Sequence, residues 1–216
     1  MDNTKCMAAL FDFDGVVMDT EKQYTIYWDK VGREYHPELS HFGAMIKGQT
    51  LTQIYDKYFA GMEAEQQRIT EGLNSFEREM SYEFVPGVED FMKDLRAHGV
   101  KIAIVTSSNE QKMANVYVAH PELKELVDRI LTAEMFTRSK PAPDCFLLGA
   151  EVFSTVPENC VVFEDSFHGI EAGNAAGMPV IGLSTTNPAE AIAAQCRWVM
   201  PDFTGFTVEK MKSVLG

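Results

Sequence analysis

Short, largely apolar runs alternate with helical patterns along most of the sequence, and this alternation limits the possible folds more than any other feature. A strand that is apolar on both sides has to be covered on both faces of its sheet, as in a parallel sheet between two layers of helices. The sequence therefore predicts an α/β fold with a parallel sheet core and helices on both faces. The expected strands are Ala8–Phe11, Val100–Val105, Arg129–Thr132, Cys160–Phe163, Pro179–Leu183 and Trp198–Met200.

Segments with helical periodicity separate these runs. Each is about ten residues long, which suits the helix that carries the chain back to the start of the next parallel strand. Gly99 follows the first of them and is typical of a helix end. The expected helices are Val88–Ala97, Glu110–Val118, Asp144–Phe153, Gly169–Ala176 and Pro188–Gln195.

The stretch from Thr20 to Tyr82 interrupts the alternation. It contains no strand-like run, and it is far longer than the roughly 4–6 residues of a typical connection. Its amphipathic patterns predict helices at Tyr24–Glu34, Leu51–Phe59 and Ala64–Met80. We therefore expect an all-helical domain of residues 19–83, inserted into an α/β core of residues 1–18 and 84–216, with linkers near Val16–Thr20 and Phe84–Gly87.

The chain is strongly acidic, with 32 acidic and 19 basic residues and a formal net charge of −13. Such a charge repels nucleic acids and anionic membrane surfaces, so neither is expected as a partner. It also repels phosphorylated metabolites. A site that binds phosphate in this chain therefore needs local positive charge from a metal ion, a lysine or backbone N–H groups.

The expected location is the cytoplasm. The cysteines, including Cys6, lie far apart without the C-x-x-C spacing of a metal or redox site, which favours unpaired thiols in a reducing compartment. Asp12 and Asp14 interrupt the apolar run near the N-terminus, and no segment approaches the roughly 20 apolar residues that span a bilayer. No feature sets the oligomeric state, and we expect a monomer.

Polar residues follow several of the predicted strands at the point where each strand ends. In open parallel sheets the carboxyl ends of the strands meet at one edge, and ligands bind there. We therefore expect these polar residues to lie close together in the folded chain. They are Asp12 with Asp14, Thr106 to Asn109, Lys140, and Glu164 with Asp165.

These residue types suit phosphoryl transfer through a carboxylate. An aspartate can act as the nucleophile, and a second carboxylate can supply and remove protons. Clustered carboxylates bind Mg²⁺, while hydroxyl and lysine groups hold the phosphoryl oxygens. Each cluster alone has an ordinary structural explanation: a helix cap for Thr106, a surface charge for Lys140, a turn for Glu164 and Asp165. Their occurrence together at successive strand ends favours the catalytic interpretation.

Ordered segments of the chain also match the motifs of a known family. Phe11–Glu21, Val105–Ser108, Ser139–Asp144 and Val162–Ser166 resemble motifs one to four of the haloacid dehalogenase superfamily, and the small-residue run Gly169–Met178 resembles the helix that follows. The likeness extends over nearly the whole chain. It is greatest to the β-phosphoglucomutase-like phosphatases, which implies a Rossmann-like core and a helical cap, of the C1 type, between the first two strands.

The resemblance implies roles for individual residues. Asp12 would be the nucleophile and Asp14 the general acid and base. Thr106 would bind the transferring phosphoryl group, and Lys140 would bridge that group and the nucleophile. Ser107 and Ser108 are expected to bind the substrate. The implied cofactor is Mg²⁺, held by Asp12, the backbone carbonyl of Asp14, and Asp165 with Glu164.

Mutase members of the family carry a histidine just after motif one and an arginine after a Lys-Gly pair of the cap. Here the first position is Tyr24, and Lys47-Gly48 is followed by Gln49 without an arginine. These differences favour transfer to water over transfer to a second sugar hydroxyl. Lys47 and Gln49 are candidates for substrate contacts from the cap, with solvated surface residues as the alternative.

Three functions therefore follow from the sequence. The first is a magnesium-dependent phosphatase acting on a small phosphorylated metabolite, with a sugar phosphate as the first candidate. The second is an isomerase of the β-phosphoglucomutase type. The third is a non-catalytic phosphate-binding module, against which the retention of Asp12, Asp14, Thr106, Lys140 and Asp165 counts.

Overall fold

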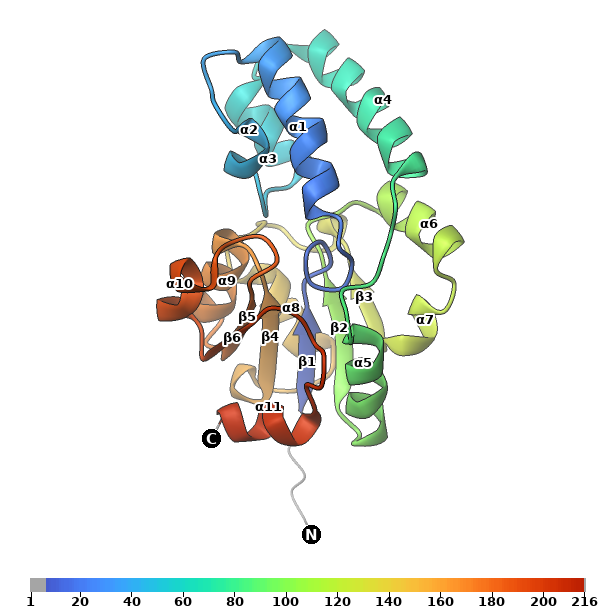
Figure 1. Cartoon of the computed structure of the whole chain (residues 1–216), viewed down its shortest axis with the longest axis vertical. Helices are drawn as coiled ribbons and strands as arrows, with labels where there is room; N and C mark the ends of the chain where they lie inside the picture. Colours follow the sequence, from blue (N-terminus) through green and yellow to red (C-terminus); the bar gives the residue numbers. More distant parts are fainter. Residues whose placement is uncertain (1–6, 216) are drawn as a thin grey trace.

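The computed structural model describes residues 7–215, and within them six strands form one parallel sheet (Figure 1). The spatial order of the strands is β3-β2-β1-β4-β5-β6, so β1 lies in the interior of the sheet. The predicted α/β fold with a parallel sheet is confirmed. The strands are β1 (Ala8–Phe11), β2 (Lys101–Val105), β3 (Arg129–Leu131), β4 (Cys160–Glu164), β5 (Val180–Leu183) and β6 (Trp198–Met200).

Alternate residues of each strand pack on opposite faces of the sheet, because successive side chains of a strand point in opposite directions. Ala9 and Phe11 belong to one hydrophobic cluster, and Ala8 and Leu10 belong to the other. The first face is covered by α5 (Val88–Ala97), α6 (Glu110–Ala119), α7 (Leu123–Leu126) and α11 (Val208–Leu215). The second is covered by α8 (Asp144–Val152), α9 (Phe167–Ala175) and α10 (Ala189–Ile192).

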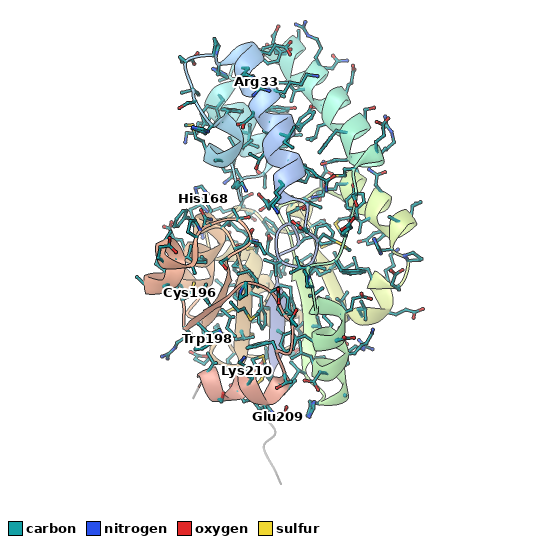
Figure 2. All side chains as sticks on the ribbon, viewed as in Figure 1. Arg33, His168, Cys196, Trp198, Glu209 and Lys210 are labelled. Carbon is teal, nitrogen blue, oxygen red and sulfur yellow. The ribbon has the colours of Figure 1, made fainter. Side chains whose placement is uncertain are left out.

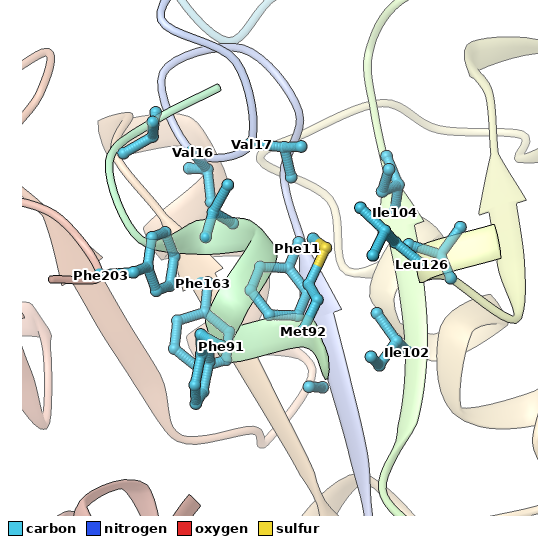
Figure 3. Close-up of a cluster of buried hydrophobic side chains, with 14 of the residues drawn as sticks. Phe11, Val16, Val17, Phe91, Met92, Ile102, Ile104, Leu126, Phe163 and Phe203 are labelled. Carbon is cyan, nitrogen blue, oxygen red and sulfur yellow. The ribbon is translucent and has the colours of Figure 1, made fainter. Parts of the chain in front are cut away.

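A group of phenylalanines packs against β1 and β4 on the face of the sheet that α5 covers (Figure 3). The rings of Phe11 and Phe163 are stacked with centroids 4.5 Å apart, and Phe91 of α5 lies edge-on to both. Phe203 stacks on Phe91 at 5.5 Å. Because Phe11 precedes Asp12 and Phe163 precedes Glu164, this packing fixes the backbone positions from which those two carboxylate side chains extend.

Between β1 and α5 the described chain forms helices joined by loops, and no strand of the sheet. They are α1 (Glu21–Tyr35), α2 (Phe42–Met45), α3 (Leu51–Tyr58) and α4 (Glu63–Glu79). Residues 19–83 are called the helical insertion below. It has a hydrophobic cluster of its own, centred on Trp28, Phe42 and Phe59. Figure 1 shows it beyond the carboxyl ends of the strands.

The two segments that connect the insertion to the sheet run side by side. Met18 and Phe84 form an antiparallel bridge, and the N–H of Asp19 donates to the carbonyl of Glu83 at 2.8 Å. The N–H of Val85 donates to the carbonyl of Val17 at 2.9 Å. Both connections therefore meet the core at one place, close to Asp14.

Several details differ from the sequence predictions. Helix α9 begins at Phe167 rather than Gly169, because the Ser166 hydroxyl accepts a hydrogen bond from the Gly169 N–H and caps the helix. Helix α10 ends at Ile192 and continues as a 3₁₀ turn. Helices α2, α7 and α11 were not predicted. Cys6 lies outside the described residues. None of the helices in residues 7–215 has the length and apolar character needed to cross a membrane.

Candidate active site

The strand ends and the helical insertion enclose a cavity of about 820 Å³. Phe11 of β1 pairs in register with Phe163 of β4, so Asp12 and Glu164 leave the sheet side by side. Thr106 follows β2 on the other side of β1. The carboxyl ends of three neighbouring strands thus bring together residues that are far apart in the sequence.

Lys140 lies at the centre of this arrangement and is 1% exposed. Its Nζ donates to Asp12 Oδ1 at 2.5 Å, to Glu164 Oε1 at 2.7 Å and to the carbonyl of Val105 at 3.2 Å. Burial alone would lower the pKa of Lys140, but the carboxylates of Asp12 and Glu164 raise it well above its usual value. The lysine is therefore a fixed positive charge next to Asp12.

Glu164 uses both of its carboxylate oxygens within the protein. Oε1 accepts from Lys140, and Oε2 accepts from the N–H groups of Asp165 and Ser166 and from the Ser166 hydroxyl, at 2.8–3.0 Å. A Cβ at Gly169 would lie 1.7 Å from Oε1, so helix α9 approaches this closely only with glycine there. Glu164 therefore orients Lys140, and Asp12 and Asp165 have the more accessible oxygens.

The chemistry of the carboxylates fits a divalent cation. One oxygen each from Asp12, Glu164 and Asp165 lies within 4.8 Å of the others. Burial, partly offset by Lys140, raises the pKa of Asp12 to about 7. Burial and the neighbouring carboxylates, Glu21 first among them, raise the pKa of Asp165 well above its usual value. Crowded, hard oxygen donors that disfavour one another's charge are the donor set Mg²⁺ requires.

Asp165 is held by the loop after β5, which the sequence analysis did not identify. The Thr186 hydroxyl donates to Asp165 Oδ2, and the Asn187 amide donates to the Asp165 carbonyl at 2.8 Å. Gly15 has φ +76°, and a Cβ there would lie 2.0 Å from Asp165 Oδ2. The polar run Ser184–Asn187 follows a predicted strand, and that position was the available signal.

Asp14 lies next to the base of the insertion and is held by three side chains. Its Oδ1 accepts from the Thr20 hydroxyl at 2.5 Å, and its Oδ2 accepts from the Ser108 hydroxyl at 3.0 Å. Lys112 donates to both oxygens, at 2.6 and 2.5 Å. Lys112 was not among the predicted site residues, although a lysine in the first turn of a helix is electrostatically unfavourable and could have signalled a role.

Thr106 and Ser107, the other residues expected from motif two, face the cavity. Thr106 is buried, and its hydroxyl accepts from the N–H of Ser108 at 3.0 Å, which shapes the turn after β2. The Ser107 hydroxyl donates to the carbonyl of Gly48 in the insertion at 3.4 Å. Asn109 caps α6 by accepting from the N–H of Lys112 at 2.9 Å.

Residues 46–53 of the insertion, a loop followed by the first turn of α3, contact the core over the cavity. Lys47 Nζ lies 2.7 Å from a carboxylate oxygen of Glu21, and its carbonyl lies 3.0 Å from Nδ1 of His168. Figure 2 shows His168 where the core meets the insertion. Gln49 lines the cavity while its amide donates to Met45. Gln53, which was not predicted, donates to the carbonyl of Lys140 at 3.1 Å.

Comparison with known proteins places this geometry in context. Residues 9–183 match the family described as Haloacid dehalogenase-like hydrolase. A fructose-1-phosphate phosphatase of Escherichia coli K12 is 32% identical over 188 residues, covering 81% of this chain and 94% of the relative. Hexitol phosphatase A of the same organism is 31% identical over 186 residues, covering 83% and 84%.

Among solved structures, a β-phosphoglucomutase from Clostridium difficile superposes with a TM-score of 0.80 at 25% identity, covering 97% of this chain and 96% of that chain. The comparison therefore includes both the sheet and the helical insertion.

Proposed function

The chain belongs to the haloacid dehalogenase-like hydrolases and is a phosphatase, and we propose that it hydrolyses a sugar phosphate with Mg²⁺ as cofactor through an aspartyl-phosphate on Asp12. The observation that carries this proposal is the pairing of buried Asp12 with Lys140 beside Asp165, at the floor of the cavity. Relatives named for fructose-1-phosphate and hexitol phosphates support a polyhydroxylated substrate.

In the first step an Asp12 carboxylate oxygen attacks phosphorus, and the bond from phosphorus to the sugar oxygen breaks. Asp14 donates a proton to that leaving oxygen. Water then attacks the phosphorus of the aspartyl-phosphate while Asp14 takes its proton, and inorganic phosphate leaves. Lys140 and the Thr106 hydroxyl donate hydrogen bonds to the phosphoryl oxygens, where fixed donors stabilise developing charge.

Asp12, Asp165 and the backbone carbonyl of Asp14 would hold the Mg²⁺, with Glu164 beside them as the residue that orients Lys140. A bound magnesium ion supplies positive charge to the phosphoryl oxygens. The loop after β5 keeps Asp165 in place for this role through Thr186 and Asn187.

The helical insertion would act as a cap domain over the α/β core of residues 1–18 and 84–216. Its contacts with the core at Ser107, Lys140 and His168 support a closed arrangement that excludes water from the cavity. Lys47 and Gln49 would contact the sugar, and Ser107 and Ser108 the phosphate end. The proposed location is the cytoplasm, because widely spaced cysteines favour unpaired thiols in a reducing compartment.

The mutase remains the second candidate, and the structural likeness to a β-phosphoglucomutase favours it. Tyr24 counts against it. It stands at the position of the mutase histidine and has no imidazole to offer. Its hydroxyl donates to Glu77 Oε1 of the insertion at 2.8 Å. A mutase would also require a bisphosphate activator and would release little free phosphate.

The test is phosphate release from a panel of sugar phosphates with Mg²⁺, with and without a sugar bisphosphate. We expect steady release of inorganic phosphate from one class of sugar phosphate without the activator. Isomerisation that depends on the bisphosphate would establish the mutase, and no reaction on any member of the panel would overturn the proposed sugar-phosphate substrate.

A further inference from the structure

Lys112 is a buried cation at a position where the helix itself disfavours positive charge. It is the third residue after the N-cap Asn109 of α6, and it is 3% exposed. The N-terminus of a helix carries partial positive charge, and burial of an ammonium group costs further free energy. Compensating partners must therefore hold Lys112 there.

The core supplies the first set of partners. Nζ of Lys112 donates to both oxygens of Asp14, at 2.6 and 2.5 Å, and to the Ser108 hydroxyl at 3.0 Å. Nζ also lies 5.3 Å from the centre of the Phe13 ring. With the Thr20 hydroxyl on Oδ1, the Asp14 carboxylate accepts hydrogen bonds at both oxygens and has little freedom to rotate.

The helical insertion supplies the second set. The Tyr24 ring of α1 lies with its centre 4.5 Å from Nζ of Lys112, a cation–π distance. The Tyr24 hydroxyl donates to Glu77 of α4, a carboxylate that is 5% exposed. Burial raises the pKa of Glu77, and the charge of Lys112 partly offsets that effect. Lys112 thus lies between one carboxylate of the core and one of the insertion.

Lys112 makes no described contact with Asp12, whose hydrogen-bond partner is Lys140. We propose that Lys112 is the positioning residue of Asp14: it sets the direction from which the Asp14 carboxyl group reaches the leaving oxygen and the attacking water, and Tyr24 completes its enclosure from the insertion. The inference rests on the proposed function, because Asp14 matters only if it transfers protons.

The position of Asp14 matters most when the leaving group needs a proton. A sugar alkoxide is a poor leaving group that depends on the general acid, whereas an aryl phosphate expels a phenolate that needs little protonation. Loss of Lys112 should therefore slow the two substrate types by different factors. A purely structural lysine would slow both equally.

The experiment measures kcat and KM of Lys112→Met on a hexose phosphate and on p-nitrophenyl phosphate. Lys112→Arg retains the charge and serves as a second variant if Lys112→Met does not fold, and exposed Lys124→Met of α7 is the matched control. We expect Lys112→Met to lower kcat on the hexose phosphate by about 10- to 100-fold. The factor by which kcat falls on the aryl phosphate should be about tenfold smaller. Lys112→Arg should show the same selectivity with a smaller loss.

A double-variant comparison isolates the partner. In an Asp14→Asn background, Lys112→Met should cause no further substrate-selective loss, because the two residues act as one unit. Equal losses on both substrates, or a selective loss that persists in that background, would overturn the proposal. A rise in KM on both substrates at constant kcat would make Lys112 a substrate-binding residue instead. Failure of the wild-type protein to release phosphate from either substrate would overturn the proposed function itself.

Discussion

Two buried lysines, Lys140 and Lys112, each hold a motif-one aspartate, but they differ in where their partners come from. Lys140 binds Asp12 and Glu164, and its hydrogen bonds to side chains stay within the α/β core. Lys112 binds Asp14 and lies against Tyr24 of the insertion. The proposed nucleophile is therefore held by the core alone, whereas the proposed proton-transfer residue is held where the core meets the insertion.

This difference assigns the two halves of the proposed reaction to different structural units. The Lys140 cluster, which consists of Asp12, Lys140, Glu164 and Asp165, would keep its geometry whether or not the insertion is docked. The Lys112 cluster, which consists of Asp14, Ser108, Lys112, Tyr24 and Glu77, is complete only with the insertion in place. Proton transfer would then be available only over a covered cavity.

The strongest test of the Lys140 cluster is Asp12→Asn. Loss of the nucleophile should reduce kcat by at least about 10⁴-fold on sugar and aryl phosphates alike, and no phosphoenzyme should be trapped. Steady-state assays and rapid quenching with labelled substrate measure both effects. The far-UV circular dichroism spectrum should match that of the wild type, because the amide fills the same space. A trapped phosphoenzyme in this variant would place the nucleophile elsewhere.

Removal of the metal should act on the same cluster. Treatment with EDTA should abolish phosphate release from both substrate types, and Mg²⁺ should restore it, because the crowded carboxylates of Asp12 and Asp165 need a cation between them and the anionic substrate. Magnesium binding measured by calorimetry gives an independent readout. Full activity in metal-free buffer would contradict the prediction.

The Lys112 cluster predicts a different result for Asp14→Asn. The nucleophile and the proposed carbonyl ligand remain, so Mg²⁺ affinity should be retained. Loss of the proton donor should slow sugar phosphates by about 10²–10⁴-fold, and aryl phosphates by clearly less. The control is Asp19→Asn, an exposed carboxylate nearby in the same segment. Equal slowing of both substrates, with phosphoenzyme hydrolysis shown not to limit either, would place the acid elsewhere and make His168 the next candidate.

The two lysines should also differ in their contribution to stability. Lys140→Met leaves buried carboxylates without their cation and should lower the free energy of unfolding by about 3–5 kcal/mol, the usual cost of breaking a buried ion pair. Lys112→Met should cost less, because Asp14 is partly accessible to water with its side chain 18% exposed. Urea unfolding at pH 7 measures both. A larger loss for Lys112→Met would reverse the comparison.

The smallest expected effect concerns Glu77. Burial raises the pKa of Glu77 above its usual 4.5, so the folded state binds its proton more tightly than the unfolded state does. Stability of the wild type should therefore fall as pH rises from 4.5 towards the raised pKa. Glu77→Gln should lack this decrease and change stability at pH 7 by no more than about 1 kcal/mol. The same pH dependence of the free energy of unfolding in the wild type and Glu77→Gln would argue against a raised pKa of Glu77.

Most of the sheet and several of the helices could be predicted from the sequence, because local periodicity reports which faces of an element are covered. Trp198–Met200 and Val88–Ala97 have the predicted bounds. The four-residue helices α2 and α7 could not be predicted, since so short an element contains too little of a helical period. The start of helix α9 could not be predicted either, because it depends on the hydrogen bond from the Gly169 N–H to the Ser166 hydroxyl, and a serine can form other turns equally well.

The sequence by itself determined that Asp12, Thr106 and Asp165 would meet, because the carboxyl ends of parallel strands share one edge whatever the details of packing. Only the tertiary structure decided how the charges are partnered. Glu164 accepts a hydrogen bond from Lys140, and Asp14 accepts one from Lys112 of α6. Those pairings depend on distances of a few ångströms between segments far apart in the chain, and no local pattern in the sequence encodes such distances.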